Sequence, residues 1–499
     1  MDPNDPHPTS APISQRGVHD LLDDLSSGRL SSADIVASLL ERIAAVDAPG
    51  SDVSLRSILA LCADAEHEAR SRDRDRRDGV HRGPLHGVPV LVKDNIEAVG
   101  LPGTAGSLAL AGRTVATDSP VAARLRAAGA VIVGSTNLSE WANFRSSGSI
   151  SGWSAVGGLT GNPWALDRSA GGSSSGSGAA VAAGLAPVAI GTETNGSITC
   201  PAALNGVVGI KPTVGSVPTA GVVPISASQD VPGPLARSVR DAALVLEVIS
   251  GRGGLVDACR PEAARSLRVG VASGWMTGDA ATDAAFMGAV GIVEPLVAEL
   301  RDVTAPGPDM AVYEDQTDVL IGELLDDMDA YLSGRAGDGV HSLAEVVAFN
   351  NEHRADELAH FGQDYFDRAL VSGGRAAQAY QDARRRNVDW ARDTCMGPAL
   401  AEGVDVIIAP AYRPAWKSDL THGDVLSGGG IVCTPPAILG WPILTLPMGL
   451  VDGLPVGLSI VGPAGSEARL IALGHALEQA LGLSGSGALL PRWRPPQRG

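Results

Sequence analysis

The sequence predicts an α/β fold in which helices are layered on a β-sheet, and two observations support this prediction. The apolar run that ends at Lys93 is short and rich in β-branched residues, which is typical of a buried strand. A second such run, Ala130–Gly134, follows a helix predicted over Pro120–Ala128. Strand-like and helix-like segments then continue to alternate, which is the pattern of a layered α/β protein.

A helix is predicted to begin after Ser31 and to end near Asp47. Ser31 is a suitable N-cap, Asp34 places an acid in the first turn, and apolar residues follow at helical spacing. The highly charged stretch Arg70–Arg82 is interpreted as a solvated loop or helix end. The remaining predicted elements are a helix over Ser238–Ile249, strands at Val404–Ala409, Leu444–Leu446 and Val456–Val461, and a closing helix over about Glu467–Leu481.

One domain is expected over residues 16–490, because neither a clear linker nor an internal repeat interrupts them. Residues 1–15 are rich in Pro, Asp and Ser and are expected to form a flexible N-terminal tail rather than a signal peptide. The Gly- and Ser-rich stretch 143–200 contains tryptophans and a long apolar run, so it is interpreted as loops within a core, not as a linker. Residues 310–400 are acidic and helical in pattern, and we interpret them as a helical insertion or cap.

The composition excludes several classes of function. A net charge of −18 argues against nucleic-acid binding, which needs a basic face. No apolar run reaches the ~18 residues of a membrane-spanning helix. The five cysteines are odd in number and widely spaced, which argues against a disulfide framework or a structural zinc site. We therefore expect a cytoplasmic protein that binds neither nucleic acid nor membrane and needs no cofactor or metal ion.

Lys93 is the first candidate for chemistry, because it ends a strand that is predicted to be buried. Burial lowers the pKa of a lysine, and a neutral amine near pH 7 is a competent general base. The structural alternative is a lysine that reaches solvent or pairs with Asp94. The chain has only two other lysines, Lys211 and Lys417, so any lysine-dependent mechanism has few candidates.

Two serine-containing segments follow Lys93. In Gly171–Gly178, the letters Gly172-x-Ser174-x-Gly176 fit the nucleophile elbow of α/β-hydrolases, although a Gly/Ser-rich stretch meets this pattern easily. That interpretation needs an acid and a histidine, and nothing around His422 or His475 is diagnostic. In Gly191–Ile198, a polar turn after an apolar strand presents a serine and successive N–H groups, which can stabilise the oxyanion of acyl transfer.

Taken together, the strand with Lys93, the segment G-G-S-S-S-G and the segment G-T-E-T-N-G-S-I resemble the amidase signature family in order and spacing. The resemblance runs from about residue 20 to residue 485 and is weakest over 310–400. It implies a large mixed β-sheet covered by helices on both sides. Within the family the sequence is most similar to bacterial peptide amidases. The stretches that match peptide amidases are Asn137–Arg145, Ser149–Ser154, Ile190–Ile198, Pro410, Pro414–Lys417 and Gly423–Asp424. Further stretches that match the family are Gly134–Glu140, Gly161–Trp164, Gly206–Thr213, Ser228–Asp230, Gly233–Arg237 and Pro455–Ile460.

The resemblance implies a Ser-cisSer-Lys triad. Lys93 matches the base, Ser173 the proton shuttle that a cis peptide bond precedes, and Ser197 the nucleophile. Ser197 would attack an amide carbonyl, release ammonia and leave an acyl-enzyme that water cleaves. The oxyanion would be held by the backbone N–H groups of Thr194, Asn195, Gly196 and Ser197.

The resemblance also bears on the substrate. Cys200 stands where some members of the family place an arginine, which argues against a small dicarboxylate half-amide. Asn143 matches a position on the cleft wall and is expected to contact a small-molecule or peptide amide substrate. C-terminal peptide amides are the favoured substrates, and the chain is expected to be a monomer or homodimer.

Alternative functions stay open. The family that the chain resembles also includes amidases of small, aryl or cyclic amides and the transamidating component of a tRNA-dependent amidotransferase. Both activities are alternatives for this chain. A non-catalytic binding protein on the same scaffold and an esterase that uses Ser174 are the other hypotheses.

Overall fold

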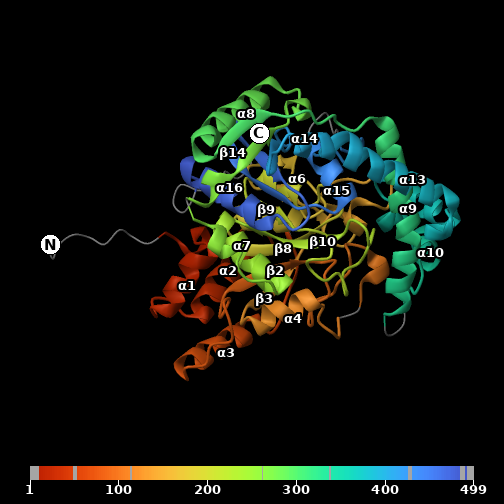
Figure 1. Ribbon diagram of the computed structural model, residues 1–499. Coiled ribbons are helices and arrows are strands. Elements are labelled where there is room, and N and C mark those ends of the chain that lie inside the picture. The colour runs from red at the N-terminus through yellow and green to blue at the C-terminus, as the bar shows by residue number, and fades with distance from the viewer. Residues whose placement is uncertain are drawn as a thin grey trace, which may run out of the picture.

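The computed structural model describes residues 11–48, 53–112, 115–260, 262–335, 339–424, 430–483 and 489–491. An eleven-stranded sheet runs through this part of the chain in the order β1-β3-β2-β8-β10-β9-β14-β15-β13-β11-β12 (Figure 1). Its strands are β1 (Ile58–Leu61), β2 (Pro89–Lys93), β3 (Val131–Thr136), β8 (Val188–Glu193), β9 (Val208–Lys211), β10 (Val231–Ala236), β11 (Arg268–Val271), β12 (Glu299–Asp302), β13 (Val406–Pro410), β14 (Ile443–Val451) and β15 (Leu454–Val461).

The sheet mixes parallel and antiparallel pairs. β3, β2 and β8 are parallel neighbours, and so are β13, β11 and β12. The strands between these groups, and the edge strand β1, pair antiparallel. The predicted α/β class and the mixed sheet are therefore confirmed. Four short strands form two separate ribbons: β4 (Trp153–Ser154) with β5 (Gly158–Leu159), and β6 (Gly161–Asn162) with β7 (Ala165–Ser169).

Helices cover the sheet in two layers. α5 packs on β2, β3, β8 and β10, and α6 packs on β9, β14 and β15. In the other layer, α7 packs on β9 and β10 and contacts α4 and α16. The helices that lie nearest to the sheet are α2 (Ser32–Val46), α3 (Ala65–Arg77), α4 (Pro120–Ala127), α5 (Ser175–Ala182), α6 (Thr199–Asn205), α7 (Val239–Ser250), α8 (Ala280–Val293) and α16 (Glu467–Ala480).

The acidic segment after residue 310 folds into helices, which are α9 (Met310–Ser333), α10 (Leu343–Glu352), α11 (Arg354–Glu357), α12 (Asp364–Val371), α13 (Gln378–Asp389) and α14 (Gly397–Ala401). Of these, α9, α10 and α13 lie together at one side of the sheet in Figure 1, whereas α14 lies nearer to the middle of the view. The remaining helices are α1 (Val18–Ser26) and α15 (Thr434–Leu439). Residues 1–10 of the expected tail lie outside the described residues, whereas Ile13–Gln15 forms a 3-10 turn against α2. No helix in the described ranges has the length and hydropathy needed to cross a membrane.

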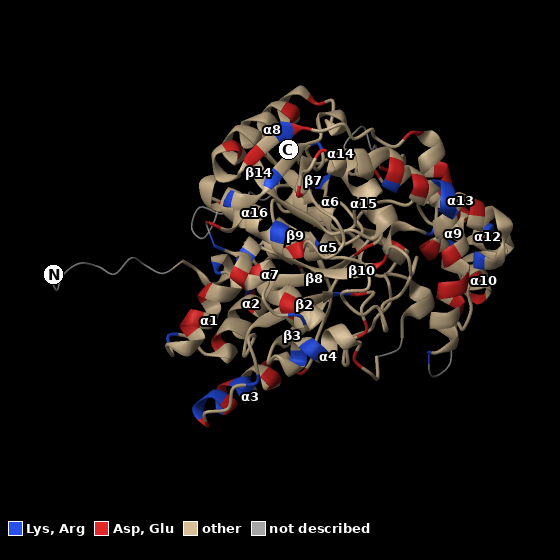
Figure 2. Ribbon diagram, viewed as in Figure 1, with Lys and Arg blue, Asp and Glu red and all other residues tan. Residues whose placement is uncertain are grey.

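Most predicted elements are confirmed, and two can be stated more exactly. Of the two interpretations of Arg70–Arg82, the helix end is confirmed as far as Arg77, where α3 ends. Ion pairs along the helix, such as Glu66 with Arg70, offset the low hydrophobicity of this segment, and Figure 2 shows both signs of charge on α3. The strand predicted at Leu444–Leu446 is also longer than expected: β14 continues to Val451, because it forms an antiparallel hairpin with β15.

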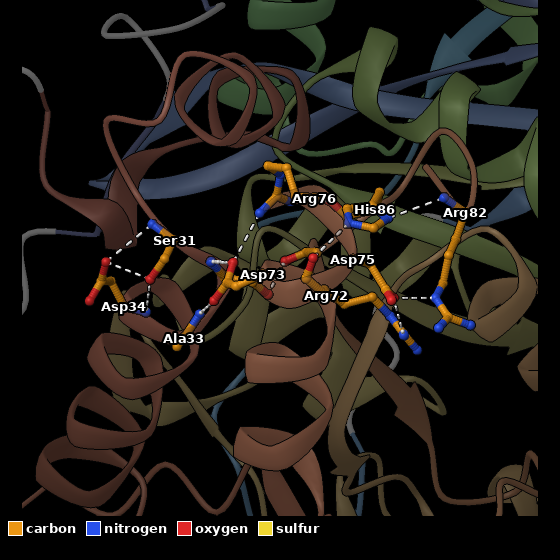
Figure 3. Close-up of polar contacts among 11 residues, drawn as sticks. Ser31, Ala33, Asp34, Arg72, Asp73, Asp75, Arg76, Arg82 and His86 are labelled. Carbon is orange, nitrogen blue, oxygen red and sulfur yellow. Dashed lines mark hydrogen bonds and ion pairs between the residues drawn. The ribbon is translucent and has the colours of Figure 1, made fainter. Parts of the chain in front are cut away.

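The first turn of α2 is capped from two directions (Figure 3). The Ser31 hydroxyl accepts a hydrogen bond from the backbone N–H of Asp34 at 3.0 Å. The carboxylate of Asp73 on α3 accepts from the N–H groups of Ser32, at 2.7 Å, and Ala33, at 3.0 Å. Arg76 holds this carboxylate through an ion pair of 2.9 Å. One side chain therefore satisfies two N–H groups that a helix start leaves unpaired, and it joins α2 to α3.

Asp73→Ala is expected to lower the free energy of unfolding by about 1–2 kcal/mol, because it removes a two-bond helix cap. The measurement is urea unfolding followed by circular dichroism. Asp78→Ala is the matched control, since Asp78 lies exposed at the end of the same helix, and it is expected to change stability by less than about 0.5 kcal/mol. Equal losses in the two variants would contradict the capping role.

Candidate active site

Lys93 lies at the end of β2 with no exposed surface. Its Nζ donates to Ser173 Oγ at 2.8 Å and to the side-chain hydroxyl of Thr192 at 2.8 Å, with a longer bond of 3.4 Å to the Thr192 carbonyl. Asn95 also donates to the Thr192 hydroxyl, at 3.0 Å. The carboxylate of Asp94 instead accepts from Thr104. The structural alternative, in which Lys93 reaches solvent or pairs with Asp94, is therefore wrong.

Burial lowers the pKa of Lys93 to about 7, against the smaller opposing effect of the Asp230 and Glu193 carboxylates. A substantial fraction of the amine is neutral near pH 7 and is able to accept a proton. Lys211 offers a comparison: burial lowers its pKa to about 8, but its Nζ donates to the backbone carbonyls of Trp441, at 2.8 Å, and Pro212, at 3.3 Å. Lys93 differs because its two short hydrogen bonds, of 2.8 Å, go to hydroxyl groups.

Ser173 and Ser174 have different surroundings although they are adjacent. The peptide bond between Gly172 and Ser173 is cis, and the Ser173 hydroxyl meets Lys93. The Ser174 hydroxyl is buried and points to β8, where it donates to the Thr192 carbonyl at 3.0 Å and accepts from the Thr192 N–H at 3.2 Å. Ser174 thus anchors the start of α5 to the sheet, and the nucleophile-elbow interpretation of this serine finds no support in the structure.

A tight turn follows β8 and carries Ser197. The carboxylate of Glu193 accepts from the N–H groups of Ile198, at 2.7 Å, and Thr199, at 2.8 Å, which fixes the turn at the start of α6. Gly196 adopts a φ of 84°, a conformation that residues with a side chain rarely adopt. Among the described residues, no protein acceptor takes a hydrogen bond from the N–H groups of 194–197. These four N–H groups therefore have no protein partner in the described part of the chain.

A backbone hydrogen bond brings the segment of Ser173 close to Ser197. The Ser174 N–H donates to the Ser197 carbonyl at 3.0 Å, which places the segment of Ser173 beside the turn. Ser197 keeps 8% of its surface exposed, whereas Ser173 is fully buried. Within the described part of the chain, Lys93 and Ser173 are hydrogen-bonded, but Ser173 Oγ and Ser197 Oγ are not.

A cleft of about 610 Å³ opens beside Ser197. Asn143 is on its wall, and its Oδ1 is buried without a hydrogen-bond partner among the described residues. The wall bends sharply here, because Trp141, Ala142 and Asn143 have successive φ values of 49°, 53° and 71°. Apolar and aromatic side chains line much of the rest: Phe144, Ile225, Met276, Tyr313, Leu320, Tyr412, Trp416 and Ile431.

A buried ion cluster holds this wall against the helices that follow residue 310. Arg145 has no exposed surface and pairs with Glu140 and, at 3.3 Å, with Glu357 of α11. Its guanidinium also lies 4.3 Å from the ring centre of Phe361. Burial holds the pKa of Glu140 well above its ordinary value, against the opposing effect of Arg145. The cluster thus fixes the backbone next to Asn143.

Sequence reasoning missed several residues of this site. Asn95 lies in the turn that follows β2, and no sequence pattern marked it. Thr192 belongs to a recognised motif but had no assigned role. Gln316 of α9 hydrogen-bonds to Asn195, although no motif marks its segment. The described residues contain no group of His, Cys, Asp or Glu side chains that is arranged to bind a metal ion.

Solved structures show the fold of this chain in related proteins. The native peptide amidase of Stenotrophomonas maltophilia is 41% identical and superposes with a TM-score of 0.90, over 97% of this chain and 99% of that protein. A structure of the peptide amidase PAM with the competitive inhibitor chymostatin has the same identity and TM-score, over 98% and 100% of the two chains. The peptide amidase similarity expected from the sequence is therefore confirmed.

Sequence comparison gives the same family. A component of the glutamyl-tRNA(Gln) amidotransferase from Anaeromyxobacter dehalogenans is 36% identical, over 93% of this chain and 96% of the relative. The family described as Amidase matches residues 34–471. The chain therefore belongs to the amidase family, and it is an amide-hydrolysing enzyme.

Proposed function

We propose that the protein removes the C-terminal amide of peptides and releases ammonia, with Ser197 as nucleophile, Ser173 as proton shuttle and Lys93 as base. The observation that supports this proposal most directly is the 2.8 Å hydrogen bond between Lys93 Nζ and Ser173 Oγ beside the turn of Ser197. A buried amine with a pKa of about 7 and a hydroxyl partner has the properties of a general base.

The first half of the reaction forms an acyl-enzyme. Lys93 accepts a proton from Ser173 as Ser173 accepts one from Ser197, and Ser197 Oγ bonds to the carbonyl carbon. The carbonyl oxygen becomes an oxyanion that the N–H groups of residues 194–197 bind. Ser173 then gives a proton to the amide nitrogen and takes back the proton held by Lys93, and the oxyanion collapses to a carbonyl as the C–N bond breaks and ammonia leaves. Water attacks the resulting ester by the same proton route and frees Ser197.

The cleft supports a peptide as the acyl group. Its volume is within the range of about 300–1,000 Å³ typical of sites for small ligands and chain ends. Its apolar and aromatic lining suits the side chains of a peptide, and the unpartnered Oδ1 of Asn143 is a suitable acceptor for a backbone N–H of the substrate. Cys200, which replaces the arginine that suits acidic substrates, also lines the cleft, and burial raises its pKa to about 12, so it carries no charge.

An ammonia-release screen of the purified chain tests the proposal. N-acetylated dipeptide amides are expected to react at least ~10-fold faster than free amino-acid amides or aliphatic amides, because only they fill the cleft and reach Asn143. Ser197→Ala serves as the control for contaminating activity. Equal rates for all three amide classes would contradict the peptide preference.

One alternative is that the chain is a component of an amidotransferase, as its relative from Anaeromyxobacter dehalogenans is named. Under that alternative, the chain would be inactive alone and would form an obligate complex. Size-exclusion chromatography of the active chain distinguishes the two, and the proposal expects an active monomer or homodimer.

A further inference from the structure

Asn195 lies in the turn that carries Ser197, and its side chain is hydrogen-bonded to two other segments of the chain. Its Nδ2 donates to Gln316 Oε1 at 3.1 Å and to the hydroxyl of Thr434 at 3.2 Å. Gln316 belongs to α9 and is 4% exposed. Its own Nε2 donates to Gln229 Oε1 at 3.1 Å, so both ends of the Gln316 amide are used.

The same helix braces the turn by a second route. Glu323 of α9 accepts from the hydroxyl of Ser226 and, at 3.1 Å, from the N–H of Ser228. Asp230, which ends this loop, accepts from the hydroxyl of Thr194 at 2.5 Å and from the N–H of Ser226 at 2.9 Å. α9 is therefore connected to residue 194 through the loop and to residue 195 directly.

The turn needs such support because its function depends on the direction of free N–H groups. Gly196 lies between Asn195 and Ser197 and has no side chain to fix it, and the four N–H groups make no protein hydrogen bond within the described residues. Donors that are placed in advance stabilise an oxyanion most, and removal of one such donor costs roughly 10²–10³-fold in kcat. A displacement of about 1 Å costs a comparable factor.

We propose that Gln316 is a positioning residue, which acts through Asn195 to aim the N–H groups of the turn at the substrate oxygen. The inference rests on the proposed role of Ser197 as nucleophile. It gives the acidic helical segment a part in catalysis, because α9 then sets the geometry of the turn as well as forming a wall of the cleft. It also explains the asparagine in the turn: its N–H belongs to the site, and its side chain connects the site to α9.

The test compares Gln316→Met with Gln363→Met in steady-state hydrolysis of an N-acetylated dipeptide amide. Methionine keeps the size of glutamine and removes both hydrogen bonds. Gln363 is the matched control, because it is a buried glutamine of the same helical region that bonds to Asn350 at 2.9 Å and does not line the cleft. Gln316→Met is expected to lower kcat by about 10–100-fold with KM changed by less than about threefold, and Gln363→Met to change kcat by less than about twofold.

Two further readouts separate positioning from a structural role. A peptide aldehyde, which forms a tetrahedral adduct with an active serine, is expected to bind Gln316→Met more weakly by the same factor as the loss in kcat/KM. Asn195→Ala combined with Gln316→Met is expected to be no slower than the slower single variant, because both act on one contact.

The outcomes distinguish failure of the inference from failure of the proposed function. Equal kcat in the two glutamine variants, or losses that multiply in the double variant, would overturn the role of Gln316 while Ser197→Ala stays inactive. Full activity of Ser197→Ala would instead overturn the proposed function itself.

Discussion

Ser197→Ala is expected to lower kcat for a peptide amide by about 10⁴-fold or more, the largest effect of any single change in this chain. The reason is that the variant keeps the cleft and the free N–H groups of the turn but lacks the atom that forms the acyl-enzyme. Binding of the substrate is expected to change little, because the hydroxyl is one small group on the wall of a large cleft. Ammonia release measures the rate, and mass spectrometry of a quenched slow substrate measures the acyl-enzyme.

Ser174→Ala is the matched control for that experiment. Ser174 is the serine of the G-x-S-x-G letters, yet its hydroxyl bonds to the N–H and carbonyl of Thr192. Its loss is expected to lower the free energy of unfolding by about 1–3 kcal/mol and to leave kcat within about tenfold of the parent. Loss of activity in Ser174→Ala together with an active Ser197→Ala would reverse the assignment and favour the esterase hypothesis.

The fold could be predicted where local signals agree with burial. β2 was recognisable because a short β-branched run leaves few alternatives, and α7 because Leu244, Val245 and Val248 fall on one side of a helix. The structure adds that Ser238 caps α7, since its hydroxyl accepts from the N–H of Asp241 at 3.1 Å. The length of β14 could not be predicted, because its second half depends on pairing with β15 and contains a register shift between Pro447 and Gly449. The order of strands in the sheet likewise depends on pairing between segments far apart in the chain, and the pattern of one sequence does not predict it.

The site shows the same division between local and tertiary information. Lys93, Ser173 and Ser197 stand in motifs with fixed order; in the structure Lys93 is hydrogen-bonded to Ser173, and Ser197 lines the cleft. Gln316 is 121 residues from Asn195 and lies in a segment without a motif, so only the folded chain brings the two together. The role of Ser174 was ambiguous for a related reason: the sequence letters suit a nucleophile, whereas the direction of the hydroxyl is a property of the packed structure.

The buried lysine also has a cost in stability. The pKa of Lys93 is about 7 in the folded protein, compared with an ordinary value of 10.5. Between these two values the unfolded chain binds more protons than the folded one, so the free energy of unfolding rises as pH increases from about 7 to about 10.5. Below pH 7 the lysine is charged in both states and its full burial cost is present. A residue that destabilises the fold at the working pH is more easily understood as a functional group than as a structural one.

Lys93→Met is therefore expected to have opposite effects on activity and on stability. It removes the base and is expected to lower kcat by about 10³-fold or more. At pH 7 the variant is expected to be at least as stable as the parent, because an apolar side chain of similar length carries no burial cost. In the parent, kcat/KM is expected to rise with pH and to level off above a midpoint near 7, as the amine loses its proton.

The pH dependence supplies the control. Lys211 is the second fully buried lysine, with a pKa lowered to about 8 and only carbonyl partners, so Lys211→Met tests burial without the proposed base. It is expected to keep the rise in kcat/KM near pH 7, whereas Lys93→Met is expected to lose it along with most of the activity. If Lys93→Met kept the parent's rise, the titrating group would be another residue, and Lys93 would be a structural lysine. If Lys93→Met lost activity only because it failed to fold, urea unfolding at pH 7 would show a lower free energy of unfolding, which is the reverse of the expected sign.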